Sequence, residues 1–120
     1  MTATVLIVED EADLGALLAD VLQTAGFHVI LTTSGRAEER VRNSEPAAIV
    51  TDYMMPGING AEVMKNVRRV LKDSAPPVVL ITGMDNAEEL AASIGATAFL
   101  RKPFDMDEFV HMVQQVVDRG

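Results

Sequence analysis

Polar and charged side chains follow four separate apolar segments of this sequence. They are Glu9 and Asp10 after residues 5–8, Asp52 after residues 48–50, Thr82 after residues 78–81, and Lys102 after residues 98–100. Carboxylates bind hard divalent cations, and an ammonium group neutralises phosphoryl oxygens. A carboxylate between such groups can attack phosphorus as a nucleophile. If the segment ends meet in space, these residue types predict a phosphoryl-transfer site.

Five segments predict the strands that would position these residues. They are residues 5–8, 28–32, 48–52, 78–81 and 98–100. Apolar runs without alternation are typical of strands buried on both faces, as in parallel sheets. Apolar residues at helical spacing predict helices around residues 14–22, 63–71 and 105–117. Cap residues predict two more helices, a weaker polar one around residues 36–43 and one over residues 85–95, so that five helices alternate with the strands. This alternation with short connections predicts an α/β fold with helices on both faces of the sheet.

The common topology for such a chain is doubly wound, with strand order 2-1-3-4-5 and a ligand crevice between strands 1 and 3. Glu9, Asp10 and Asp52 would then share one pocket, with Lys102 and Thr82 beside it. Two unit charges about 4 Å apart repel by about 4 kcal/mol at an effective dielectric near 20, so a cation is required. Oxygen ligands without His or Cys favour Mg²⁺, with Mn²⁺ as the alternative.

Each residue also has a simpler explanation. The run Glu9-Asp10-Glu11 is typical of the acidic first turn of a helix. Asp52 could cap the turn that follows its strand, and Thr82 and Lys102 could be ordinary strand-end and surface residues. The functional interpretation is favoured because four strands deliver complementary groups to one edge of the sheet.

Turn and cap residues predict where several helices begin and end. Ser34 is the predicted N-cap of the second helix. Asp85 and Glu88 have the spacing of a capping box that opens the fourth helix. Gly26 and Gly95 are expected to end the first and fourth helices.

Length and composition limit the class of protein. A length of 120 residues predicts a single domain over residues 1–120. The formal charge of −8 disfavours direct binding to nucleic acid and suits cationic partners, including metal ions. The chain has no cysteine, no apolar run near the roughly 20 residues that span a bilayer, and no signal-peptide pattern. We therefore expect a cytoplasmic protein without a membrane partner.

Four segments, in order and at matching spacing, resemble the response-regulator receiver domain of two-component signalling. They are Val8-Glu9-Asp10, the pattern Asp52-x-x-Met55-Pro56-x-x-x-Gly60, residues 77–83, and the pattern Gly95-Ala96-x-x-Phe99-Leu100-x-Lys102-Pro103-Phe104. The resemblance extends from Val5 to about Val117. It implies the flavodoxin-like form of the doubly wound fold.

The resemblance implies a phosphoacceptor with a metal beside it. Asp52 matches the residue that receives a phosphoryl group from a histidine kinase or a histidine phosphotransfer protein. Asp10 matches a direct Mg²⁺ ligand, and Glu9 matches a neighbour that acts mainly through water. The backbone carbonyl of Met54 matches a further metal ligand.

The resemblance also implies a switch. Thr82 and Lys102 match the switch hydroxyl and the phosphate-contacting lysine, with Gly83 and Pro103 in supporting positions. The bond before Pro103 is usually cis in the family. Phe99 matches an aromatic residue that turns inward on activation, although a simpler explanation is core packing. Phe99 lacks the hydroxyl of the commoner tyrosine.

Partners follow from the same resemblance. The fourth helix, fifth strand and fifth helix would carry the change to a downstream protein or to an output domain, and family members often dimerise on this face when phosphorylated. The implied protein is a signalling switch rather than an enzyme, apart from assisting its own phosphorylation and dephosphorylation. The kinase, the target and the oligomeric state stay open.

Met54 and Met84 lie two residues beyond Asp52 and Thr82, where they would flank the route of a hydrolytic water. We hypothesise that these apolar side chains lengthen the lifetime of the phosphoryl group.

Two other functions are less favoured by the sequence. A Mg²⁺-dependent phosphatase with an aspartyl nucleophile would need a second acid at position 54, which is methionine, and a domain to cap its substrate. A binding module that never takes up phosphate is disfavoured because Asp52, Thr82 and Lys102 are all present.

Overall fold

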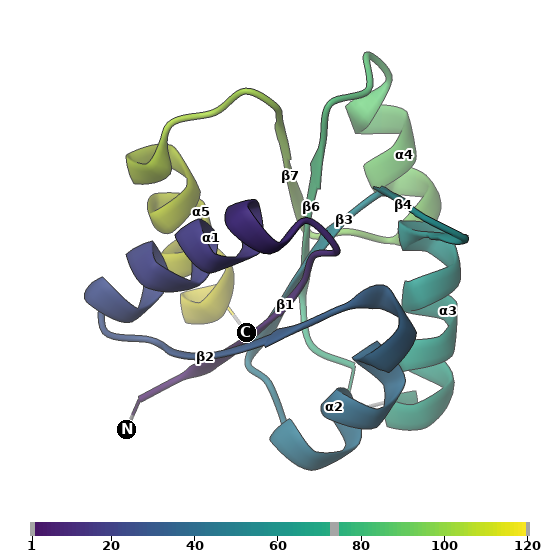
Figure 1. Cartoon of the computed structure of the whole chain (residues 1–120), viewed down its shortest axis with the longest axis horizontal. Coiled ribbons are helices and arrows are strands. Elements are labelled where there is room, and N and C mark those ends of the chain that lie inside the picture. The colour runs from purple at the N-terminus through teal and green to yellow at the C-terminus, as the bar shows by residue number, and fades with distance from the viewer. Residues whose placement is uncertain (1, 73–74, 120) are drawn as a thin grey trace.

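A computed structural model of the chain describes residues 2–72 and 75–119. Within these residues, five strands form a parallel sheet in the order β2-β1-β3-β6-β7 (Figure 1). The strands are β1 (Thr4–Val8), β2 (His28–Thr32), β3 (Ala48–Asp52), β6 (Val78–Thr82) and β7 (Ala98–Arg101). The α-helices are α1 (Ala12–Thr24), α2 (Ala37–Ser44), α3 (Gly60–Leu71), α4 (Ala87–Ile94) and α5 (Met106–Arg119).

The predicted fold is confirmed. The order 2-1-3-4-5 corresponds to the observed sheet, because β6 and β7 are its fourth and fifth strands along the chain. Two short strands, β4 (Met54–Met55) and β5 (Ile58–Asn59), pair with each other outside this sheet. The fold is the doubly wound, flavodoxin-like α/β architecture.

The sheet is covered on both faces. Helices α1 and α5 pack on one face and α2, α3 and α4 on the other, as Figure 1 shows. Every residue of β3 and β6 is buried, which explains why these segments lack an alternating polar pattern. Each fully buried valine, leucine or isoleucine contributes about 1.5–3 kcal/mol. The carboxyl ends of the strands are thus held at one rigid edge.

The segment after Asp52 forms a small hairpin that the sequence did not predict. Strands β4 and β5 are antiparallel, and Gly57 adopts a φ of 78° in the turn between them. Asn59 then caps α3 and forms a capping box with Glu62. The hairpin and cap start α3 at Gly60, three residues before the predicted start.

Gly60 lies directly behind the end of β3. A Cβ at this position would be 2.8 Å from the carbonyl oxygen of Asp52 and 3.0 Å from the Cα of Tyr53. Both neighbours are backbone atoms, so the chain must shift to accept a side chain. We expect Gly60→Ala to lower the free energy of unfolding by about 2 kcal/mol in urea titrations. Gly35→Ala is the matched control, because a Cβ there meets nothing within 4 Å; equal losses would contradict the explanation.

Two of the predicted helix starts are wrong. Ser34 begins a 3₁₀ turn, η1 (Ser34–Arg36), and the N-cap of α2 is Arg36. The Ser34 hydroxyl instead donates to Asp10, a residue 24 positions away in the sequence. The N-cap of α4 is Asn86, one residue after the predicted Asp85, and it makes no side-chain cap hydrogen bond. Ser34 contacts Asp10 and Asp85 contacts Arg101, and the local spacing of the sequence does not reveal either partner.

The predicted helix ends are confirmed. Gly26 follows the C-cap of α1 with a φ of 103°, and Gly95 is the C-cap of α4 with a φ of 67°. Both angles lie in the left-handed region that favours glycine.

Over residues 2–72 and 75–119, no helix combines the length and the apolar character needed to cross a bilayer.

Candidate functional site

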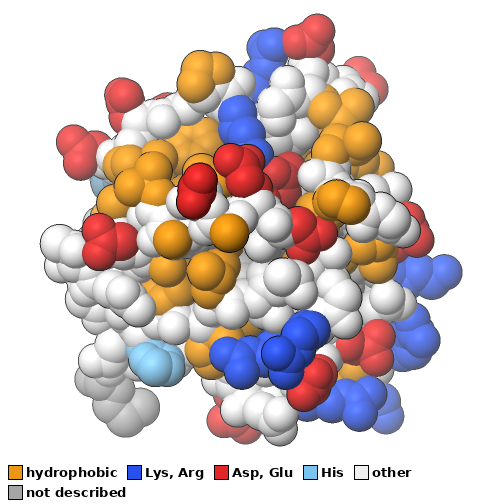
Figure 2. All heavy atoms as spheres, in the orientation of Figure 1, with side chains coloured by type: hydrophobic (Ala, Val, Ile, Leu, Met, Phe, Trp, Pro, Cys, Tyr) orange, Lys and Arg blue, Asp and Glu red, His pale blue; other side chains and the backbone are white. Residues whose placement is uncertain are grey.

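A pocket of about 470 Å³ lies at the carboxyl edge of the sheet. Its lining includes Glu9, Asp10, Asp52, Met54, Met84 and Lys102. The strand register explains the convergence: Val8 pairs with Thr51, Asp52 with Ile81, and Thr82 with Arg101. In Figure 2 acidic side chains gather around the middle of the view with a basic side chain just above them, whereas other basic side chains gather over α2 and α3.

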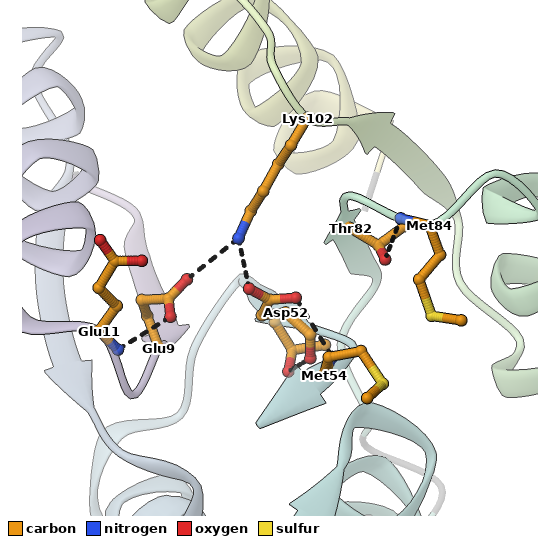
Figure 3. Close-up of polar contacts among 8 residues, drawn as sticks. Glu9, Glu11, Asp52, Met54, Thr82, Met84 and Lys102 are labelled. Atoms are coloured by element: carbon orange, nitrogen blue, oxygen red, sulfur yellow. Dashed lines mark hydrogen bonds and ion pairs between the residues drawn. The ribbon is translucent and has the colours of Figure 1, made fainter. Parts of the chain in front are cut away.

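Lys102 connects the two buried carboxylates of the pocket. Its Nζ lies 2.5 Å from Oδ2 of Asp52 and 3.9 Å from Oε1 of Glu9 (Figure 3). The side chains of Asp52 and Glu9 are only 8% and 4% exposed. Screening by water is weak at this depth, so the ammonium is the main compensation for both negative charges.

Glu9 is the least satisfied of these groups. Its Oε2 accepts a hydrogen bond of 3.0 Å from the backbone N–H of Glu11, but its buried Oε1 has no hydrogen-bond partner among the described residues. Burial raises the pKa of Glu9, and the negative charge of Asp52 raises it further, whereas the Glu11 N–H and the charge of Lys102 oppose the rise.

The raised pKa of Glu9 predicts a pH-dependent stability. The folded chain holds this proton more tightly than the unfolded chain, so ionised Glu9 lowers the free energy of unfolding once the pH rises through the folded-state pKa. In a chelator, Glu9→Gln should therefore be more stable than the native chain at pH 7.5. The gain should shrink as the pH falls toward the ordinary value of 4.5. Urea titrations at several pH values measure this difference.

Glu11→Gln provides the control for that series, because the Glu11 side chain is exposed at the same edge. A gain for Glu9→Gln that is constant with pH, or one that Glu11→Gln reproduces, would refute burial of Glu9 as its cause.

Asp10 lines the pocket, but both oxygens of its carboxylate are hydrogen-bonded to Ser34. Its Oδ1 accepts from the backbone N–H of Ser34 and its Oδ2 accepts from the Ser34 hydroxyl, both at 2.7 Å. Among the residues that the structure describes, no three His, Cys, Asp or Glu side chains form a metal-holding group. No local pattern in the sequence predicts this contact with Ser34.

Asp52 and Thr82 end the neighbouring strands β3 and β6, and each side chain accepts a hydrogen bond from the backbone N–H two residues later. The N–H of Met54 donates to Oδ1 of Asp52 at 3.3 Å, and the N–H of Met84 donates to Oγ1 of Thr82 at 3.2 Å (Figure 3). Thr82 is fully buried, whereas Met54 and Met84 are 61% and 36% exposed. The two thioethers therefore lie at the rim of the pocket, beside the buried functional groups.

The remaining predicted residues lie around this centre. Phe99 is half-buried on β7 and packs against the hydrophobic cluster under α2, α3 and α4. Gly83 lines the pocket, and a Cβ there would be 4.0 Å from the Cβ of Lys102. The peptide bond between Lys102 and Pro103 is cis.

Comparison with known proteins identifies the family. A family model described as the response regulator receiver domain matches residues 5–114. The chain belongs to the receiver-domain family. This match confirms the family that the sequence motifs predicted. Receiver domains are signalling modules of two-component systems and not classical enzymes.

Relatives of this receiver domain differ in how much of their own length the match covers. The DNA-binding response regulator MtrA of Mycolicibacterium paratuberculosis is 32% identical over 123 residues, covering 100% of this chain and 53% of MtrA. The solved chemotaxis protein CheY4 of Vibrio cholerae has a TM-score of 0.88 at 27% identity, covering 97% of this chain and 99% of CheY4. The chain spans about half the length of the first curated relatives it matches.

One further structure of the same fold was solved with a metal ion. The receiver domain of the sensor histidine kinase PA1611 of Pseudomonas aeruginosa has a magnesium ion in its active-site cleft. Its TM-score is 0.85 at 21% identity, and the match covers 98% of this chain and 99% of that chain. At this identity the likeness shows the shared fold.

The donor set of this receiver domain fits a hard divalent cation. Glu9, Asp10 and Asp52 supply three carboxylates against the single positive charge of Lys102. The orphaned Oε1 of Glu9 is a buried acceptor without a donor, which a cation would satisfy. Carboxylate and carbonyl oxygens are the ligands that Mg²⁺ prefers.

Proposed function

We propose that Asp52 is the phosphoacceptor of this receiver domain and takes a phosphoryl group from a histidine kinase or a histidine phosphotransfer protein. The observation that carries the proposal is the 2.5 Å contact between Lys102 Nζ and Asp52 Oδ2, next to the Oε1 of Glu9 that has no hydrogen-bond partner among the described residues. The arrangement combines a nucleophile with a fixed cation and leaves an excess of negative charge for a metal to balance.

The transfer is a substitution at phosphorus. An oxygen of Asp52 forms the new O–P bond, and the P–N bond of a phosphohistidine, or the P–O bond of acetyl phosphate, breaks with its electron pair leaving on the donor. Lys102 stabilises negative charge on the phosphoryl oxygens. Glu9, Asp52 and the Met54 carbonyl would hold Mg²⁺, with Asp10 joining them. When bound, the ion supplies further charge neutralisation.

Thr82 and Phe99 form the proposed switch. Leu80 pairs with Phe99 and Thr82 pairs with Arg101, so Thr82 and Phe99 lie on the same face of the sheet, under α4. The Thr82 hydroxyl accepts a hydrogen bond from Met84 and remains able to donate to a phosphoryl oxygen. Such a bond would favour the state in which Phe99 turns inward, as a shift between two populations.

The proposed output surface consists of α4, β7 and α5. It would bind a downstream protein, an output domain, or a second phosphorylated copy. MtrA is a DNA-binding response regulator, but the charge of −8 on this chain favours a protein target over direct contact with nucleic acid.

The test is the intact mass of the chain after incubation with acetyl phosphate, with and without Mg²⁺. We expect one added phosphoryl group that depends on Mg²⁺. No addition under any condition would favour a binding module that never takes up phosphate. Continuous turnover of small phosphomonoesters would instead favour a phosphatase. Mn²⁺ in place of Mg²⁺ should also support the addition.

Met54 and Met84 should set the lifetime of the phosphoryl group. Both side chains lie at the pocket rim, where an apolar surface excludes the water that hydrolyses the aspartyl phosphate. We expect Met84→Glu and Met54→Asn each to shorten the lifetime several-fold, because a polar side chain can hydrogen-bond that water. Decay of the phosphorylated mass measures the rate. Met112→Asn, on α5 and outside the pocket lining, is the control, and unchanged decay in both rim variants would disprove the idea.

A further inference from the structure

Asp10 and Ser34 meet because β1 and β2 are paired in register. Val8 pairs with Thr32, and the N–H of Glu9 continues the ladder with a 3.0 Å hydrogen bond to the Thr32 carbonyl. Asp10 and Ser34 each lie two residues beyond that pair. Ser34 donates both its N–H and its hydroxyl to the Asp10 carboxylate, so one residue engages both carboxylate oxygens.

This contact separates Asp10 from the other two carboxylates of the pocket. Glu9 and Asp52 share Lys102, whereas Asp10 is oriented toward the segment that follows β2. Within the described part of the chain no three acidic side chains form a group that could hold a metal. Because each Asp10 oxygen already accepts a hydrogen bond from Ser34, a cation that binds Asp10 together with Glu9 and Asp52 draws on the same two oxygens.

We propose that Ser34 competes with the divalent cation for the Asp10 carboxylate and thereby sets the metal affinity of the site. The inference rests on the proposed metal site at Glu9, Asp10 and Asp52. Hydrogen bonds to a carboxylate at 2.7 Å are among the stronger ones in proteins, and metal binding must weaken two of them. Removing one donor should shift the competition toward the cation.

The competition also links the metal to the start of η1. Ser34 is the first residue of this 3₁₀ turn, which leads directly into α2. If the cation draws Asp10 away, the N–H and hydroxyl of Ser34 lose their acceptors and the turn is free to rearrange. By linkage, anything that fixes this turn with Ser34 on Asp10 weakens metal binding to the same extent.

The test measures the dissociation constants of Mg²⁺ and Mn²⁺ by calorimetry for the native chain, Ser34→Ala and Ser34→Thr. Ser34→Ala should bind about fivefold more tightly, because the hydroxyl donor is lost while the backbone donor remains. Ser34→Thr keeps the hydroxyl and should match the native chain. Ser93→Ala on α4 is the matched control, since its hydroxyl donates to the Leu90 carbonyl far from the pocket.

A second readout follows the native chain itself. The amide resonances of Ser34 and Gly35 should shift when Mg²⁺ saturates the site, in parallel with those beside Asp52. A purely structural role for Ser34 would leave the Ser34 amide unmoved. This measurement keeps the proposal testable even if Ser34→Ala folds poorly.

The outcomes separate this inference from the proposed function. Unchanged or weaker metal binding by Ser34→Ala, or a Ser34 amide that does not respond to Mg²⁺, overturns the competition while the metal site stands. If the native chain binds neither ion, the metal site and the competition both fail. Tighter binding by Ser34→Ala together with a native constant for Ser34→Thr supports the proposal.

Discussion

Asp52→Asn is expected to abolish the Mg²⁺-dependent gain of one phosphoryl group from acetyl phosphate, reducing its rate by at least about a hundredfold. The amide lacks the negative charge that attacks phosphorus, and it also gives up the ion pair with Lys102. Intact mass spectrometry measures the loss, and peptide mapping of the native chain locates the modified residue.

Asp13→Asn is the matched control for this experiment. Asp13 is an exposed acid in the first turn of α1, at the same edge of the sheet, and its variant should be phosphorylated at the native rate. Phosphorylation that persists in Asp52→Asn, or that maps to Glu9 or Asp10 in the native chain, would show that the nucleophile has been assigned wrongly. Asp52→Asn should also remain folded, because it removes one of two neighbouring buried charges.

Lys102→Met should destabilise the metal-free chain by about 2 kcal/mol. Within the described residues, Lys102 forms the only ion pairs of Glu9 and Asp52, and methionine keeps its aliphatic stem while removing the charge. Breaking a fully buried ion pair costs about 3–5 kcal/mol. The expected loss of stability is smaller here because the Lys102 side chain is 29% exposed and its charge is partly screened. Urea titration in a chelator measures the loss.

Mg²⁺ should restore much of the stability lost in Lys102→Met, because a cation in the pocket offsets the same two carboxylates. The double variant with Asp52→Asn should also recover stability, since only one buried charge then remains uncompensated. Arg101→Met is the control, because its ion pair with the exposed Asp85 should contribute less than about 1 kcal/mol. A loss in Lys102→Met that is no larger than in Arg101→Met would mean that Lys102 does not neutralise the pocket.

The fold could be predicted closely because its signals are local. The apolar runs of β3 and β6 mark strands buried on both faces, and the helical stripes mark the covering layers. The positions of Gly26 and Gly95 predicted helix ends correctly because a left-handed residue at that place strongly favours glycine. Helix starts were less predictable, because Ser34 and Asp85 have tertiary partners that compete with capping.

The hairpin after Asp52 was missed for a related reason. Strands β4 and β5 have two residues each, too few to show any periodicity. The hairpin places Gly60, the first residue of α3, against the backbone of Asp52. No local sequence pattern encodes that contact.

The sequence by itself determined which residue types reach the carboxyl edge: the carboxylates Glu9, Asp10 and Asp52, and the ammonium of Lys102. Strand ends are visible in a linear pattern, and an open parallel sheet brings all of its carboxyl ends to one side. Only the tertiary structure decided which of these groups contact one another. Lys102 reaches Asp52 across 50 residues and Ser34 holds Asp10 across 24, because strand register and burial fix those partners and local periodicity carries no information about either.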